Sequence, residues 1–241
     1  MTWCRECNIF PLKQAGKWST LSRMKQNVSP TQKVLNVWAI VLIVWSIYRA
    51  KFLTTLPIWF DEFVAKPIVF LVPVWHYITR VEKRPFFPGI DLKLKTPSKD
   101  LMMGFFIGMI FFLSGAVSYY LKHHTLIAPT VMSPQFLILV AVSVATSISE
   151  EIVSRGFVLK RLYEESKNIY SSSFLASVLF FFLHVPILFT NPNIIGFMLL
   201  RVMITDMILS LAISFIYLQR RNILIPIVIH ALYNLSIYMF T

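Results

Sequence analysis

TSISEEIVSRGF, residues 146–157, interrupts a long apolar segment with three charged side chains. Small or apolar residues precede this stretch and apolar residues follow it, as in a membrane-spanning helix. Between them stand Glu150, Glu151 and Arg155. Charged side chains in mid-membrane are energetically costly, so they are rare and usually functional. The stretch therefore predicts a membrane helix that carries a functional site.

The composition of the whole chain is that of a membrane protein. Of its 241 residues, 56% are hydrophobic and 15% aromatic, with a mean hydropathy of +0.67. Soluble domains of this length rarely reach such values. Several apolar runs approach the roughly 20 residues that a helix needs to cross a bilayer. The predicted fold is all-α, a polytopic transmembrane helical bundle with an intramembrane polar cavity.

The net charge of +12 is distributed as in a membrane protein rather than a nucleic-acid-binding one. Most basic residues fall in four segments, which are 1–33, 80–100, 155–167 and the pair Arg220–Arg221. Poorly charged connections separate these segments, which is the positive-inside pattern. We therefore expect a cytoplasmic N-terminus and anionic lipids as partners, with no nucleic acid. The low glycine count and lysine-rich loops favour a prokaryotic cell membrane.

Seven spans are expected, with an eighth short or re-entrant helix conceivable at 49–62. Their approximate ranges are 34–48, 63–79, 101–121, 134–159, 172–189, 194–218 and 223–240. Prolines at positions 67 and 73 predict kinks in the second span. Gly104 and Gly108 in the third form a GxxxG pair that lets another helix approach closely.

The spans and charges suggest three parts. We predict a basic cytoplasmic tail at 1–33, a two-span segment with a basic loop at 34–100, and a catalytic membrane core at 101–241 whose motifs lie in 134–241. Cys4 and Cys7 form a single CxxC in the tail, which gives little support for a zinc site without a second pair.

Ionisable residues of three separate spans are predicted at nearly one depth. Counting from the nearest basic residues at 1.5 Å per residue, Glu150 lies roughly 15 Å deep and His230 roughly 13 Å. His184 lies at a similar depth in the fifth span. Helices with such residues turn them away from lipid, so we expect the three side chains to meet in the interior of the bundle.

Spacing within each helix assigns faces to these side chains. Glu151 and Arg155 are four residues apart, which predicts a salt bridge. Glu150 is rotated about 100° away from that pair and is left free to act as a general base. His230 and Asn234 also share a face, where they could ligate a metal or donate hydrogen bonds to an oxyanion.

Three motifs in this order resemble those of a known family. EEIVSR matches EExxxR, FFFLH at 180–184 matches FxxxH, and HALYN at 230–234 matches HxxxN. The sequence from Pro134 to Thr241 resembles the CAAX protease and bacteriocin-processing family, also called CPBP or Abi. The resemblance implies an intramembrane endopeptidase that cleaves a CAAX-type, bacteriocin-like or other membrane-associated peptide, reached from the membrane or the cytoplasmic side.

The resemblance also implies roles for the motif residues. Glu150 would activate the attacking water and His184 would help to hold it. Glu151 and Arg155 would support the site. His230 and Asn234 would stabilise the oxyanion or complete a metal site.

A metal is one of the alternatives that the sequence leaves open. Members of the family are often described as metalloproteases, and Zn²⁺ could be held by Glu150, His184, His230 and Asn234. The same groups can also hydrolyse a peptide without a tightly bound metal. The sequence lacks the HExxH motif of soluble zinc proteases.

Two other function classes are also consistent with these residues. The first is a non-catalytic membrane scaffold or immunity protein with the same fold. The second is a transporter or haem protein, in which His184 and His230 would be axial ligands. A serine nucleophile has weaker support, because it needs a base hydrogen-bonded to its hydroxyl and no sequence spacing predicts such a pair. Arg201 and Asp206, within the sixth span, are expected to have a structural or substrate-gating role.

Overall fold

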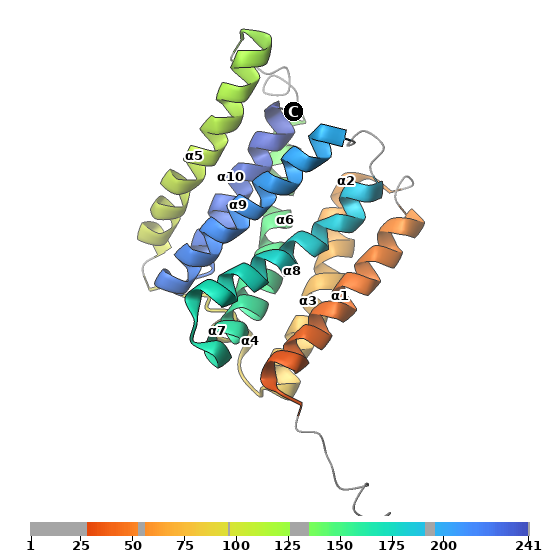
Figure 1. Ribbon diagram of the computed structural model, residues 1–241, viewed down its shortest axis with the longest axis vertical. Helices are drawn as coiled ribbons and strands as arrows, with labels where there is room; N and C mark the ends of the chain where they lie inside the picture. Colours follow the sequence, from red (N-terminus) through yellow and green to blue (C-terminus); the bar gives the residue numbers. More distant parts are fainter. Residues whose placement is uncertain (1–27, 53–55, 96, 126–134, 191–195, 241) are drawn as a thin grey trace, which may run out of the picture.

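The computed structural model describes residues 28–52, 56–95, 97–125, 135–190 and 196–240. Within these ranges the secondary structure is helical and contains no strand. The long helices lie side by side as a bundle, with the C-terminus at one end (Figure 1). The predicted all-α helical bundle is therefore confirmed. Cys4 and Cys7 lie outside the described residues.

The elements follow the predicted spans closely, with π-helical segments labelled η. In chain order they are α1 Pro30–Phe52, α2 Ile58–Phe60, η2 Asp61–Ala65, α3 Lys66–His76, η3 Tyr77–Val81, α4 Phe86–Gly89, α5 Pro97–His123, α6 Phe136–Glu151, η5 Ile152–Leu159, α7 Lys160–Ser166, α8 Ile169–Thr190, α9 Gly196–Arg220 and α10 Leu224–Phe240. The chain is continuously helical from 58 to 81 and from 136 to 166.

The chain is an integral membrane protein. Five helices of the described residues are long and apolar enough to cross a bilayer, namely α1, α5, the continuous helix 136–166, α8 and α9. The 17-residue α10 is apolar but shorter. The predicted second span corresponds to the run 58–81, in which two π-helical segments flank α3. The helix before it extends to Phe52, so most of the described residues of the predicted connection at 49–62 are helical.

The connections that carry most of the described basic residues lie at one end of the bundle. The start of α1 and the connections that follow η3, α7 and α9 all lie at this end, which is the lower end in Figure 1. We call it the basic end. This arrangement is the one that the charge pattern predicts, and the cytoplasmic orientation of the basic end stays a prediction.

Glycines let α5 pack closely against α10. A Cβ atom added at Gly104 would lie 2.9 Å from Cβ of Val228, and one at Gly108 would lie 3.1 Å from Cα of Ile229. Side chains larger than hydrogen would push the two helices apart at both positions. The predicted GxxxG contact is confirmed, and it fixes the position of the helix that carries His230.

The N-terminal helices belong to the same packed interior as the later ones. Trp45 of α1 and Phe70 of α3 are buried with their ring centroids 5.4 Å apart. Tyr77 of η3 packs edge-on against Phe157 of η5, at 5.3 Å. Apolar burial therefore holds α1 and α3 against the helix that contains Glu150.

Candidate active site

The three predicted ionisable groups meet at one carboxylate oxygen. Oε2 of Glu150, on α6, lies 3.3 Å from Nε2 of His184 on α8 and 3.7 Å from Nε2 of His230 on α10. Glu150 and His230 are buried, whereas the His184 side chain is 18% exposed. The structure thus brings the three helices together as the sequence predicts, and His184 is the most exposed of the three side chains.

Hydrogen bonds orient both imidazole rings. Nδ1 of His184 lies 3.1 Å from the backbone carbonyl oxygen of Phe180, which can only accept, so Nδ1 is the donor. Nδ1 of His230 likewise donates to Oε1 of Glu151 at 2.8 Å. In each ring the Nε2 atom is therefore the one directed at Glu150. A neutral imidazole in this orientation presents the Nε2 lone pair to whatever binds beside the carboxylate.

The predicted pair of Glu151 and Arg155 is present and buried. Nη1 of Arg155 donates to Oε1 of Glu151 at 2.8 Å, and both side chains are almost fully excluded from solvent. Nη2 of Arg155 donates to the carbonyl oxygen and hydroxyl of Ser210 on α9, at 3.1 and 2.8 Å. The guanidinium also lies over the Phe180 ring, 4.4 Å from its centroid. Arg155 therefore ties its own helix to α8 and α9, and it holds the carboxylate that orients His230.

Asn234 lies one helical turn beyond His230. Its Nδ2 atom donates to Oγ of Ser147 at 3.3 Å, and that hydroxyl in turn donates to the carbonyl of Ser143 at 2.8 Å. A carboxamide has two N–H groups, so the second remains for a ligand. Ser147 precedes Glu150 by three residues, so Asn234 is tied to the helix that carries the carboxylate.

The expectation that Glu150 is free of an ion pair is wrong. Nζ of Lys66, on α3, lies 3.0 Å from Oε1 of Glu150. Lys66 also pairs with Glu62, four residues earlier. Both lie in or beside the predicted second span. A charged side chain within a membrane span is rare and usually functional, and this holds for a lysine as well as for Glu150. The sequence interpretation missed Lys66 because no motif of the family contains it.

The two oxygens of Glu150 therefore differ. Oε1 is bound by Lys66, whereas Oε2 is buried and has no hydrogen-bond partner among the described residues. A buried carboxylate oxygen without a partner is costly. Its position between two Nε2 atoms is suited to a small polar molecule that can donate a hydrogen bond.

Among the residues that the structure describes, no group of three or more His, Cys, Asp or Glu side chains is arranged to hold a metal ion. The Lys66 ammonium already supplies a positive charge to Glu150. Zn²⁺ held by Glu150, His184, His230 and Asn234 stays a prediction.

Arg201 and Asp206 are attached to neighbouring helices, as expected. The exposed Arg201 donates to Oγ of Ser118 on α5 at 2.8 Å. The buried Asp206 accepts a hydrogen bond from the Tyr233 hydroxyl of α10 at 2.8 Å. Neither contacts Glu150, which supports a structural role for both.

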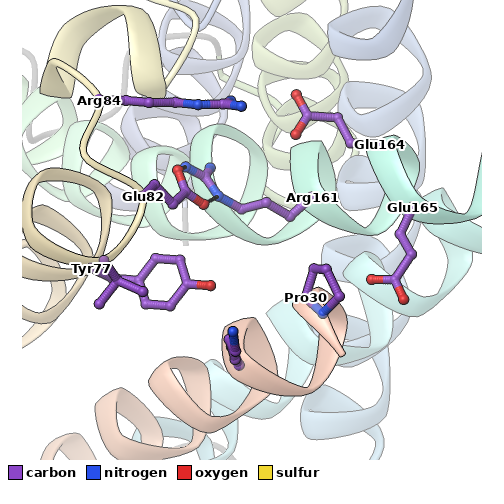
Figure 2. Close-up of a pocket in the computed structure, with 9 residues that line it drawn as sticks. Pro30, Tyr77, Glu82, Arg84, Arg161, Glu164 and Glu165 are labelled. Carbon is purple, nitrogen blue, oxygen red and sulfur yellow. Dashed lines mark hydrogen bonds and ion pairs between the residues drawn. The ribbon is translucent and has the colours of Figure 1, made fainter. Parts of the chain in front are cut away.

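A cleft of about 430 Å³ lies away from these residues. It opens at the basic end, between the start of α1, the end of η3 and α7, and Figure 2 shows Arg84, Glu164 and the pair of Arg161 with Glu82 around it. Arg161 donates to both carboxylate oxygens of Glu82, at 2.8 and 2.7 Å. The cleft is thus a polar surface feature at the membrane boundary and not the intramembrane site.

The comparison with protein families matches the C-terminal part of the chain. Residues 132–236 match the family described as type II CAAX prenyl endopeptidase Rce1-like. The matched range contains all three motifs and excludes Lys66 and Glu62. Neither the comparison with curated proteins nor that with solved structures gives a match.

Proposed function

We propose that this chain is an intramembrane endopeptidase in which a glutamate activates the attacking water. The proposal rests on the match of residues 132–236 to the type II CAAX prenyl endopeptidase Rce1-like family. One observation carries the proposal. Oε2 of Glu150, which accepts no hydrogen bond among the described residues, faces Nε2 of both His184 and His230 inside the membrane bundle.

The first step is the activation of water. A water molecule beside Glu150 would donate one hydrogen to Oε2 and the other to Nε2 of His184, whose Nδ1 is fixed as a donor. The carboxylate takes a proton as the water oxygen bonds to the peptide carbonyl carbon. Lys66 keeps the other oxygen of Glu150 occupied, so the base presents Oε2 to the water.

The second step is the stabilisation of the oxyanion. The remaining N–H of Asn234 would donate to the developing negative charge, and His230 in its protonated form would donate from Nε2. Glu151 holds the His230 ring in the required orientation. The tetrahedral intermediate then collapses as the carbon–nitrogen bond breaks, and Glu150 returns its proton to the leaving amine.

The substrate class follows from burial and from the family. His184 and Asn234 are the partly exposed members of the site, so the scissile bond would approach from their side. A membrane-associated peptide can reach that depth, and a CAAX-type C-terminal peptide is the substrate that the family description favours. Bacteriocin processing or immunity, in a prokaryotic cell membrane, is the other substrate class consistent with the family.

The other function classes receive less support from the site. A haem iron between His184 and His230 would need the space that the Glu150 carboxylate occupies. A scaffold would have no need for a buried carboxylate oxygen that accepts no hydrogen bond among the described residues.

Comparative peptidomics tests the proposal for any peptide substrate in the membrane. Membranes from cells that express the wild type or the Glu150→Ala variant at equal levels would be compared by mass spectrometry. We expect peptides with new termini in the wild-type sample alone. Identical peptide populations, together with an equal biological output of the two proteins, would instead support the scaffold.

A further inference from the structure

Lys66 is a buried cation that joins the N-terminal helices to the candidate site. Its side chain is 2% exposed, and its ammonium contacts Oε1 of Glu150 at 3.0 Å. It also contacts Oε2 of Glu62, which accepts a hydrogen bond from Thr146 at 2.6 Å. Both acidic partners are themselves buried. A lysine in such surroundings is held only because it is paired on both sides.

The surroundings of Lys66 restrict it further. Nζ lies 5.6 Å from the centroid of the Trp45 ring, within the range of a cation–π contact. The π-helical segment η2 ends immediately before Lys66, and Glu62 lies within that segment. π-Helical segments are frequent at functional sites. The ammonium is thus fixed from three directions: by α1, by its own helix and by α6.

The charge balance around Glu150 depends on Lys66. Three buried carboxylates, Glu62, Glu150 and Glu151, are paired with two buried cations, Lys66 and Arg155. The side-chain hydrogen bonds of Arg155 go to Glu151 and Ser210, and none of them reaches Glu150. Lys66 is therefore the permanently basic group in direct contact with Glu150 among the described residues.

We infer that Lys66 is a positioning residue for the general base, an inference that rests on the proposed endopeptidase function. By binding Oε1 of Glu150, it directs Oε2 toward the imidazoles and the water. Glu62 and Thr146 hold the lysine in place. Residues 58–81, outside the range that matches the family, thus contribute a member of the active site.

Kinetics of the purified full chain test this inference. Lys66→Met retains most of the volume of the side chain but removes the ammonium. We expect kcat to fall by about 10²-fold through misplacement of the base, and KM to change by less than about threefold. Lys66→Arg keeps the charge and should recover at least about tenfold of the lost kcat.

Lys160→Met is the matched control. Lys160 is also buried and pairs with Asp91 at 2.6 Å, but it lies at the basic end and contacts no motif residue. This variant should lose stability and keep kcat within about threefold of the wild type. A wild-type kcat in Lys66→Met, or an equal loss in the two methionine variants, would overturn the inference.

A thermal unfolding cycle separates this inference from the proposed function. The melting temperatures of Lys66→Met, Glu150→Gln and the double variant do not depend on a substrate. If the two residues are in contact, the melting temperature of the double variant should fall by less than the sum of the decreases in the two single variants. Additive losses would overturn the positioning role even if the protein cleaves peptides. Non-additive losses in a protein with no Glu150-dependent cleavage would support the contact and reject the endopeptidase.

Discussion

Replacing Arg155 with methionine tests how the interior holds His230. The substitution keeps an unbranched apolar side chain but removes the three hydrogen bonds to Glu151 and Ser210. Removal of one partner of a buried ion pair costs about 3–5 kcal/mol because the other charge is left uncompensated. Loss of the two contacts to Ser210 adds to this cost. We expect the free energy of unfolding to fall by at least about 3 kcal/mol, and kcat to fall because Glu151 no longer orients His230.

Arg161 provides the comparison for this experiment. It is also buried, and it donates to both oxygens of Glu82 and to two backbone carbonyls at the basic end. Equilibrium unfolding in mixed micelles, followed by circular dichroism, would measure both variants, with peptide cleavage assayed under folding conditions. Arg161→Met should lower the free energy of unfolding about as much as Arg155→Met does, but its kcat should stay close to that of the wild type. A stable Arg155→Met variant, or one with the wild-type kcat, would refute the reasoning.

Two further predictions concern helix packing and metal. Gly108→Leu places a side chain against Ile229 and Leu232 of α10, so we expect stability to fall by about 1–3 kcal/mol and activity to fall with it. Ile110→Leu, at an exposed position of the same helix, should change neither stability nor activity. A Gly108→Leu variant with wild-type stability and activity would contradict the close packing. A chelator should leave cleavage within about twofold of the untreated rate, since Lys66 supplies the charge beside Glu150. Loss of activity that added Zn²⁺ restores would show instead that a metal site forms in the working enzyme.

The sequence was sufficient to predict the bundle and the meeting of the motif residues. Long apolar runs determine the helices, because backbone polar groups in lipid must be satisfied within the segment. The cost of burying charge predicts that Glu150, His184 and His230 turn inward, and the four-residue spacing predicts the pair of Glu151 and Arg155. These inferences depend on local periodicity and on the burial preference of each single residue, and both can be read directly from a sequence.

Contacts between distant segments could not be predicted in the same way. Lys66 and Glu150 are 84 positions apart, and no periodicity relates a residue on α3 to one on α6. The burial rule could have identified Lys66 as unusual but not its partner. The identity of that partner depends on apolar packing of α1 and α3 against η5, which is a tertiary property.

The most direct test of the central claim is the cleavage rate of Glu150→Gln. Purified wild type and variant, reconstituted in liposomes, would be given a membrane-anchored CAAX-type peptide, with the products identified by mass spectrometry. Glutamine keeps the size of the side chain but cannot take a proton from water, so kcat should fall by at least about 10³-fold while the protein stays folded. Cleavage by Glu150→Gln at the wild-type rate and at the same bond would contradict the claim that Glu150 activates the water.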